Sequence, residues 1–316
     1  MSSPRVLLTI GVPRSGSTVL ERHIAQKMGL AAIGEVAHMW ERGFRQNQLC
    51  SCGAPFHECL LWKFVVERIR GTYGTEHLFL EAIRSYDQVV SCYFLPLMQV
   101  RYSVKDETLF EARKLLHAIY EAVDEFTNGR VILDSSKTSA FAYLLAPSSN
   151  VNSLFLHLIR DSRAVVFSHQ RVKRRPEIHW TEENMVTRRT RSVAINWNLQ
   201  YLAPVLLYRH THKRLLKVRY ETFASQPTAV TNEIKRFLES HAFLEPDSSC
   251  KTLSPIYHSV SGNPIRFDRE PQKIRLDDEW RQMLSYRDRR TTELLTAPFL
   301  LHHIRRIEKD ARGMDK

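Results

Sequence analysis

The sequence predicts an α/β fold in three layers, with a central parallel sheet flanked by helices. Three observations support this prediction. Apolar runs typical of buried strands alternate with segments of helical periodicity. A glycine-rich turn links the first strand to the first helix. The length of 316 residues, 43% of them hydrophobic, is sufficient for one large core.

The first strand, loop and helix stand at the start of the chain. Arg5–Ile10 (RVLLTI) is rich in leucine and β-branched residues, which suits a central parallel strand buried on both faces. Gly11–Ser17 forms the turn. Thr18–Met28 has apolar residues at helical spacing and predicts the first helix.

Further strands and helices alternate along the rest of the chain. The strands are predicted at Arg130–Leu133, Ser153–Ile159 and Leu215–Tyr220. The helices are predicted at Leu109–Phe126, Ser139–Leu145, Ser162–Arg171, Asn196–Arg209 and Thr228–His241. Gly43–Trp62 has no regular pattern. No linker is evident, so residues 1–316 are predicted to form a single domain, with 246–316 as a C-terminal extension that folds over the core.

The chain is basic, with 46 Lys and Arg against 34 Asp and Glu and a net charge of +12, which attracts anionic partners. Basic residues are locally dense at Arg171–Arg175 (RVKRR), but no aromatic-interleaved basic repeat is present, so no nucleic-acid partner is expected. No apolar stretch approaches the roughly 20 residues that span a bilayer. Val6–Ile10 indicates a strand rather than a secretory signal, so a cytoplasmic location is expected. The oligomeric state stays open.

The turn Gly11–Thr18 (GVPRSGST) is P-loop-like. It matches the nucleotide-binding pattern G-x-x-x-x-G-K-[ST] at both glycines and at the threonine, but serine replaces the lysine and the cation is Arg14. Glycines let backbone N–H groups converge on an anion, and the following helix adds its positive end. Without the lysine that spans two phosphates in ATP-using enzymes, the loop suits a smaller group and needs no metal.

Two segments resemble the cofactor-binding segments of sulfotransferases that use 3′-phosphoadenosine-5′-phosphosulfate (PAPS). PRSGST, at Pro13–Thr18, resembles the 5′-phosphosulfate-binding loop, and LIRDSRAVVFSH, at Leu158–His169, resembles the 3′-phosphate segment. An arginine at a strand end and a serine on the next helix can converge on one phosphate. The resemblance implies that the cofactor is bound by Arg14, Ser15, Gly16, Ser17, Thr18, Arg160 and Ser168.

Three further segments extend the resemblance to the bacterial members of this family, which are related to carbohydrate and tyrosylprotein sulfotransferases. ILDSSKTSAFAYLL, at Ile132–Leu145, resembles a lysine–serine segment of carbohydrate sulfotransferases. VSGNPIRF, at Val260–Phe267, resembles a late loop, which implies that Arg266 is a second cation for the 3′-phosphate. GEVAHMW, at Gly34–Trp40, resembles the segment that carries a glutamate base.

Sulfuryl transfer needs a general base for the acceptor and positive charge for the leaving group. Glu35 is the predicted base, and His38 is the second candidate. Arg14 and Lys137 are predicted to stabilise the bridging oxygen and the sulfuryl oxygens. Asp134, at the end of a predicted strand, is interpreted as structural, holding Lys137 or a loop amide.

Three of the five cysteines, Cys50, Cys52 and Cys59, form a cluster in CSCGAPFHEC. Three interpretations stay open: zinc ligands with His57 or His38 as the fourth, a disulfide, or free thiols. The spacing is not a common zinc spacing, so free thiols are favoured and no metal site is assigned.

The predicted function is in-line transfer of a sulfuryl group from PAPS to a hydroxyl or amine of a small-molecule or carbohydrate acceptor, without a metal. One alternative is a P-loop nucleotide or small-molecule kinase, which would require ATP and Mg²⁺. The other is a non-enzymatic polyanion-binding protein. The missing loop lysine opposes the kinase, and the ordered pair of phosphate segments favours an enzyme. The sequence does not identify the acceptor.

Overall fold

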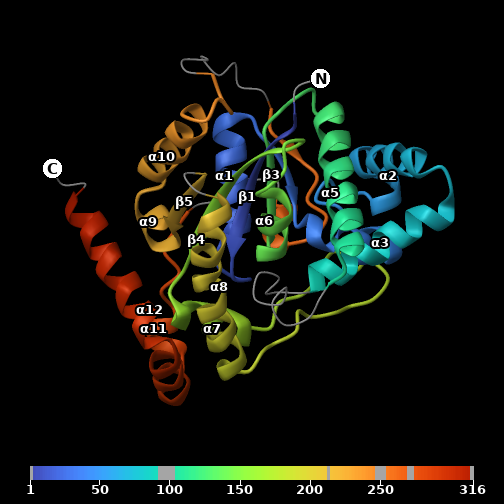
Figure 1. Ribbon diagram of the computed structural model, residues 1–316. Coiled ribbons are helices and arrows are strands. Elements are labelled where there is room, and N and C mark those ends of the chain that lie inside the picture. The colour runs from blue at the N-terminus through green and yellow to red at the C-terminus, as the bar shows by residue number, and fades with distance from the viewer. Residues whose placement is uncertain (1–2, 92–103, 212–213, 246–253, 269–273, 314–316) are drawn as a thin grey trace.

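A computed structural model describes residues 3–91, 104–211, 214–245, 254–268 and 274–313. Its central sheet has six strands, paired in parallel in the order β5-β4-β1-β3-β2-β6 (Figure 1). The strands are β1 (Arg5–Gly11), β2 (Ala31–Gly34), β3 (Ile132–Lys137), β4 (Asn152–Ile159), β5 (Leu215–Arg219) and β6 (Ile256–Tyr257). β1 lies between β4 and β3, inside the sheet, as its apolar run predicts.

Helices cover both faces of this sheet. Figure 1 shows α9 and α10 on one side and α2, α3 and α5 on the other. The helices are α1 (Ser17–Met28), α2 (Leu60–Tyr73), α3 (Glu76–Ser91), α5 (Asp106–Phe126), α6 (Ser139–Leu145), α7 (Ser162–Gln170), α8 (Thr190–Thr211), α9 (Tyr220–Ser225), α10 (Pro227–Glu239), α11 (Trp280–Met283) and α12 (Tyr286–Gly313). Short 3₁₀ turns lie at Val36–His38, Phe56–Glu58 and Pro264–Phe267, and a π-helix lies at Met39–Arg45.

Alternating side chains of the strands separate two apolar cores. In β1, Val6 and Leu8 pack into the core that α2, α3, α5 and α6 share, whereas Leu7 packs into the core that α1, α9 and α10 share. In β4, Phe155 faces the first core and Leu156 the second. A strand buried on both faces needs apolar residues at successive positions. The predicted three-layer α/β fold is confirmed.

All four predicted strands correspond to observed ones, but the predicted end of β3 is wrong. The strand does not stop at Asp134 and continues to Lys137, which pairs with Ile10 after a register shift. Its last residues are polar and still buried, because Ser135 and Ser136 turn their hydroxyls to carboxylates inside the protein. The strands and helices that were not predicted from the sequence are β2, β6, α2, α3, α9, α11 and α12.

The described C-terminal segment packs on α7 and α8. Trp280 joins Val165 and Trp197 in a third apolar cluster, and the Thr296 hydroxyl lies 2.9 Å from that of Ser162. We propose that residues 1–316 form one domain, with 246–316 as an extension over the core. Among the described helices, none combines the length and the apolar character that crossing a bilayer requires.

Glu21 ties α1 to the neighbouring strands. Its carboxylate accepts hydrogen bonds from the Gly34 backbone N–H at 2.9 Å and from the Ser135 hydroxyl at 2.8 Å. Burial raises the pKa of Glu21 to about 7, although these hydrogen bonds and Lys137 oppose the rise. The start of the helix that follows the glycine-rich loop is thus fixed to the ends of β2 and β3.

Glu21 is expected to make stability depend on pH. Its pKa is higher in the folded chain than its ordinary value of 4.5, so the folded chain binds more protons between pH 4.5 and about 7. The free energy of unfolding therefore falls as pH rises through this window, by up to about 1.4 kcal/mol per pH unit from this group. Urea unfolding across this range should show a shallower fall for Glu21→Gln than for wild type. The exposed control Glu67→Gln should keep the wild-type slope, and an unchanged slope in Glu21→Gln would contradict the assignment.

Candidate functional site

Polar residues gather where the carboxyl ends of the strands meet. The loop 12–16 follows β1, Glu35 follows β2, Lys137 ends β3 and Arg160 follows β4. In a parallel sheet these ends share one edge, and ligands bind there where connections leave to opposite sides. β1 occupies that position, because β3 and β2 lie on one side of it and β4 and β5 on the other.

The loop after β1 is held in a conformation that residues other than glycine rarely adopt. Arg14 has a φ of 70° and Gly16 a φ of 92°. A Cβ atom at position 16 would lie 2.4 Å from the Tyr220 ring, so glycine is required there. α1 begins at Ser17. The N–H groups of Val19 and Leu20 donate to the Gly16 carbonyl, whereas those of Ser17 and Thr18 precede the first hydrogen bonds of the helix. Loop and helix together form a favourable place for an anion.

Three donors beside this loop are buried without a hydrogen-bond partner: Arg14 Nη1, Ser15 Oγ and Arg160 Nε. Burial lowers the pKa of Arg14, while Glu35 and Glu177 act in the opposite direction. Buried polar groups are nearly always hydrogen-bonded, so these three donors indicate a ligand that accepts from them.

Arg160 is fixed by three contacts. Its Nη1 donates to the Arg14 carbonyl at 2.9 Å, and its Nη2 pairs with Asp277 at 3.0 Å. Its guanidinium lies 4.5 Å from the centre of the Tyr220 ring. Ser168 is buried on α7, but within the described residues no hydrogen bond joins it to Arg160. The structure therefore brings Arg160 to the loop, and the shared role of Ser168 stays a prediction.

Lys173 is a cation near the loop that the sequence analysis did not single out. Burial lowers its pKa, and Arg14, Arg171 and Arg160 lower it further, whereas Asp277 raises it. Like charges at close range repel, so an anion among them would be stabilised. The signal was the dense basic run at Arg171–Arg175.

Glu35 and Lys137 form a buried ion pair between the ends of β2 and β3. The Lys137 ammonium donates to Glu35 Oε1 and, at 2.9 Å, to the Ser135 carbonyl. Burial alone would raise the pKa of Glu35, but Lys137, His38 and Arg42 together lower it to about 2. Glu35 is therefore a carboxylate at physiological pH.

The second oxygen of Glu35 lies in a polar network. It accepts a hydrogen bond from Ser261 Oγ at 3.2 Å, and Ser261 accepts one from Arg42 at 2.6 Å. His38 Nε2 lies 3.6 Å from the same carboxylate oxygen. Burial and Arg42 lower the pKa of His38 to about 4, so this imidazole is neutral at physiological pH. Ser261 and Arg42 were not predicted from the sequence.

Asp134 makes structural hydrogen bonds, but its partners among the described residues are neither Lys137 nor a loop amide. Its carboxylate accepts hydrogen bonds from the Ser136 backbone N–H at 2.6 Å and from the Tyr120 hydroxyl at 2.7 Å. Burial raises its pKa to about 6. These bonds shape the end of β3, where Lys137 adopts a φ of 61° that few lysines adopt.

Arg266 and the first turn of α1 meet beside the late loop. Arg266 is buried, donates to the Gly262 carbonyl at 2.8 Å and lies 3.8 Å from the Glu177 carboxylate. That carboxylate opposes the charge of Arg266, and the convergence of Arg266 with Arg160 on one phosphate stays a prediction. Thr18 Oγ1 accepts from the Asn263 backbone N–H at 3.4 Å. Ser17 and Thr18 are both buried, and their direct contact with a cofactor stays a prediction.

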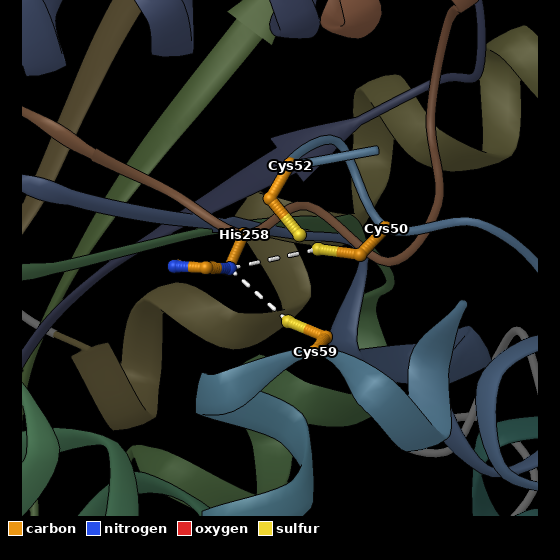
Figure 2. Close-up of side chains that lie close together, drawn as sticks. All are labelled: Cys50, Cys52, Cys59 and His258. Atoms are coloured by element: carbon orange, nitrogen blue, oxygen red, sulfur yellow. Dashed lines mark hydrogen bonds between the residues drawn. The ribbon is translucent and has the colours of Figure 1, made fainter. Parts of the chain in front are cut away.

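Cys50, Cys52 and Cys59 lie together, and the imidazole beside them is that of His258 (Figure 2). The suggested fourth ligands, His57 and His38, are therefore wrong. The reason is topological: β6 ends one residue before His258 and carries it alongside the cysteine loop. No disulfide joins Cys50, Cys52 or Cys59, so the disulfide interpretation is not supported.

Several solved structures match the chain, and three of them are aligned over nearly its whole length. The sulfotransferase domain of the Synechococcus PCC 7002 olefin synthase is 20% identical, with 95% of this chain and 96% of that chain covered and a TM-score of 0.42. The sulfotransferase domain from the curacin biosynthetic pathway is 18% identical, with 94% and 99% covered and a TM-score of 0.45. A sulfotransferase from Alicyclobacillus acidocaldarius is 13% identical, with 94% and 97% covered and a TM-score of 0.35.

Comparison of the sequence with curated proteins and with family models gave two further results. No curated protein sequence matches the chain significantly. The model of the sulfotransferase family, in contrast, matches residues 7–243, a region that includes the loop after β1, Glu35, Lys137 and Arg160. Since this match spans most of its length, the chain belongs to the sulfotransferase family.

Proposed function

We propose that the protein transfers a sulfuryl group from PAPS to a hydroxyl or amine of a small-molecule or carbohydrate acceptor. One observation carries the choice of donor: Arg14, Ser15 and Arg160 hold buried donors that have no acceptor, all beside a helix N-terminus. PAPS offers two anionic groups separated by a nucleoside. The donors belong to two strand–loop–helix units whose strands, β1 and β4, are neighbours in the sheet. A polyanion binder without a defined ligand would not require donors buried in this way.

The 5′-phosphosulfate is assigned to the loop 12–16 and the first turn of α1. Ser15 Oγ, Arg14 and the N–H groups around Gly16 supply hydrogen bonds and positive charge. This arrangement lacks the lysine with which a kinase loop reaches a γ-phosphate, so PAPS is preferred to ATP. We propose that Ser17 and Thr18 complete this part of the site.

The 3′-phosphate is assigned to Arg160, with Ser168 as the predicted second contact. Asp277 now occupies one side of the Arg160 guanidinium, as a carboxylate in place of a phosphate. Binding of the donor would therefore replace one anion on Arg160 by another, and the displaced carboxylate of Asp277, whose side chain is 31% exposed, would be solvated by water. Lys173 adds positive charge nearby. The role of Arg266 as a second cation stays a prediction, since its ion pair is with Glu177.

In the reaction, the acceptor oxygen or nitrogen forms a bond to sulfur while the bond between sulfur and the bridging oxygen breaks. We propose that Glu35 takes the acceptor's proton and that Arg14 and Lys137 stabilise the charge on the leaving group and the sulfuryl oxygens. A carboxylate with a pKa of about 2 is a weak base, and Lys137 contributes to that low value. If Lys137 turns to the sulfuryl group, the pKa of Glu35 rises and its basicity increases.

Donor binding provides the first test. Adenosine 3′,5′-bisphosphate is expected to raise the melting temperature without Mg²⁺, because a ligand that binds only the folded state stabilises it. Thermal shifts with the bisphosphate, with ATP and Mg²⁺, and with sulfate alone measure this. Stabilisation by ATP and Mg²⁺ and none by the bisphosphate would favour the kinase instead.

Arg160→Ala tests the assignment of the 3′-phosphate. The variant should weaken binding of the bisphosphate by roughly 1.5–3 kcal/mol, the usual contribution of a charge-assisted hydrogen bond. It should affect adenosine 5′-phosphosulfate much less, because that compound lacks the 3′-phosphate. Isothermal titration calorimetry with both ligands separates a lost phosphate contact from a general disturbance of the loop. Arg174→Ala, which removes an equal but exposed charge, is the matched control. Equal losses for both ligands would place Arg160 elsewhere.

Asp277→Asn should have the opposite effect. The carboxylate competes with the proposed phosphate for Arg160, so its neutralisation should tighten the bisphosphate and leave adenosine 5′-phosphosulfate nearly unchanged. The same calorimetric titrations measure both ligands. Weaker binding of the bisphosphate would show that Asp277 holds Arg160 in place rather than competing for it.

Glu35→Gln tests the base. Turnover should fall by roughly 10²–10⁴-fold, because the variant retains the shape but loses the proton acceptor. Affinity for the bisphosphate should change little, since Glu35 lies at the acceptor side. Initial rates with PAPS and a panel of hydroxyl and amine acceptors measure turnover. His38→Ala is the comparison variant. If His38→Ala loses activity while Glu35→Gln keeps activity near the wild-type level, histidine is the base. Equal loss of donor binding and turnover in Glu35→Gln would make Glu35 structural.

A further inference from the structure

We propose that Cys50, Cys52, Cys59 and His258 form a structural zinc site. The four ligand atoms lie within 4.8 Å of one another. The Cys59 sulfur is 3.1 Å from His258 Nδ1, and the Cys50 sulfur is 3.7 Å from it. Figure 2 shows the three sulfurs and Nδ1 turned toward one common centre.

These separations match what a tetrahedral zinc ion needs. With Zn–S bonds of about 2.3 Å and Zn–N bonds of about 2.0–2.1 Å, neighbouring ligand atoms stand roughly 3.5–3.8 Å apart. The distance of 3.7 Å from Cys50 to Nδ1 falls within this range, and the distance of 3.1 Å from Cys59 is shorter. No separation exceeds 4.8 Å, about an ångström more than the ideal value. Small side-chain rotations would complete the tetrahedron.

The donor set selects the metal. Three thiolates and one imidazole form one of the common structural zinc sets, whereas Mg²⁺ and Ca²⁺ prefer oxygen ligands. Four protein ligands leave no open position for water or substrate, which is typical of a structural ion rather than a catalytic one. The site is therefore consistent with sulfuryl transfer that needs no metal.

The backbone around the cysteines is shaped to present them. The Cys50 N–H donates to the Ala54 carbonyl at 2.9 Å, and the Gly53 N–H donates to the Cys50 carbonyl at 2.8 Å. Gly53 has a φ of 94°, which lets this tight turn place the side chains of Cys50 and Cys52 near each other. Cys59 stands directly before the first residue of α2.

The cysteine loop and the segment of His258 are also joined through the backbone. The Ser51 N–H donates to the Ser259 carbonyl at 3.0 Å, and Ser51 Oγ accepts from the Ser259 N–H at 2.7 Å. The Trp62 indole N–H donates to the His258 carbonyl at 2.8 Å. The imidazole is thus held against the thiols by contacts that need no metal, so the site is largely preformed.

Zinc would stabilise the segment after His258, which contacts Glu35. Ser261, three residues after His258, donates to the Glu35 carboxylate at 3.2 Å. On the other side, the Leu49 N–H donates to the Glu177 carbonyl at 3.0 Å, next to Cys50. The ion would therefore link the cysteine loop directly to the loop after β6. Through Leu49, it would also stabilise the contact of the cysteine loop with the segment of Glu177.

Metal analysis of the wild-type protein is the decisive experiment. Protein produced with zinc in the medium should contain about one zinc per chain by elemental analysis. Native mass spectrometry should show the added mass of one zinc ion less the protons it displaces. Replacement by Co²⁺ should give the visible absorption of a tetrahedral thiolate site. A metal-free chain under these conditions, or one that contains iron, would overturn the proposal.

Variants locate the ion. Cys59→Ser and His258→Gln should lose most of the bound zinc, whereas His57→Ala and Cys250→Ser should retain it. His57 is an exposed histidine of the same segment, and Cys250 is a cysteine outside the described residues. If the ligand variants do not fold, a mercurial titration of the wild-type protein replaces them. Zinc release should then follow the modification of the three clustered thiols. Retention of zinc in Cys59→Ser, or zinc loss in His57→Ala, would refute the assignment. None of these measurements depends on sulfuryl transfer, so the zinc site and the proposed function can fail separately.

Discussion

The buried ion pair of Lys137 and Glu35 is the interaction on which the arrangement of the site depends. Both side chains are largely removed from water, and either charge left alone there would be strongly unfavourable. The pair can form only when β2, β3 and the loop after β6 are all in place, because Ser261 supplies the remaining hydrogen bond to Glu35. The unusual backbone of Lys137 is a further condition, since it directs the ammonium back toward its own strand. The geometry of the candidate site therefore depends on correct packing of this edge of the sheet.

Electrostatic balance connects this pair with the loop after β1. Arg14, Arg160 and Lys173 gather there, and Asp277 and Glu177 provide the opposing charges. Burial makes each of these charges costly, so the cations are held by carboxylates that an anionic ligand can replace or join. Part of the chain's positive charge is thus concentrated at this loop, which its overall composition could not reveal.

The sequence was sufficient for parts of the protein where one segment carries its own signal. β1 and β4 are buried on both faces and are therefore apolar along their length, and the loop between β1 and α1 has a recognisable spacing of glycines. β6 has only two residues and exists through its pairing with β2, so no local pattern marks it. His258 lies 199 residues after Cys59, and only the sheet topology brings them together. The polar end of β3 was misread because its serines are buried by partners elsewhere in the chain.

The position of α12 has a consequence for how the protein is made. Residues near the chain end cover α7: Thr296 contacts Ser162, and Glu293 pairs with Arg163 at 3.1 Å. During synthesis on the ribosome, the strands β1 to β5 emerge before these residues do, so Val165 and Trp197 remain without Trp280 until α11 has been made. In that interval the nascent chain would expose an apolar surface, and the docking of α11 and α12 would remove this surface from the reach of aggregation.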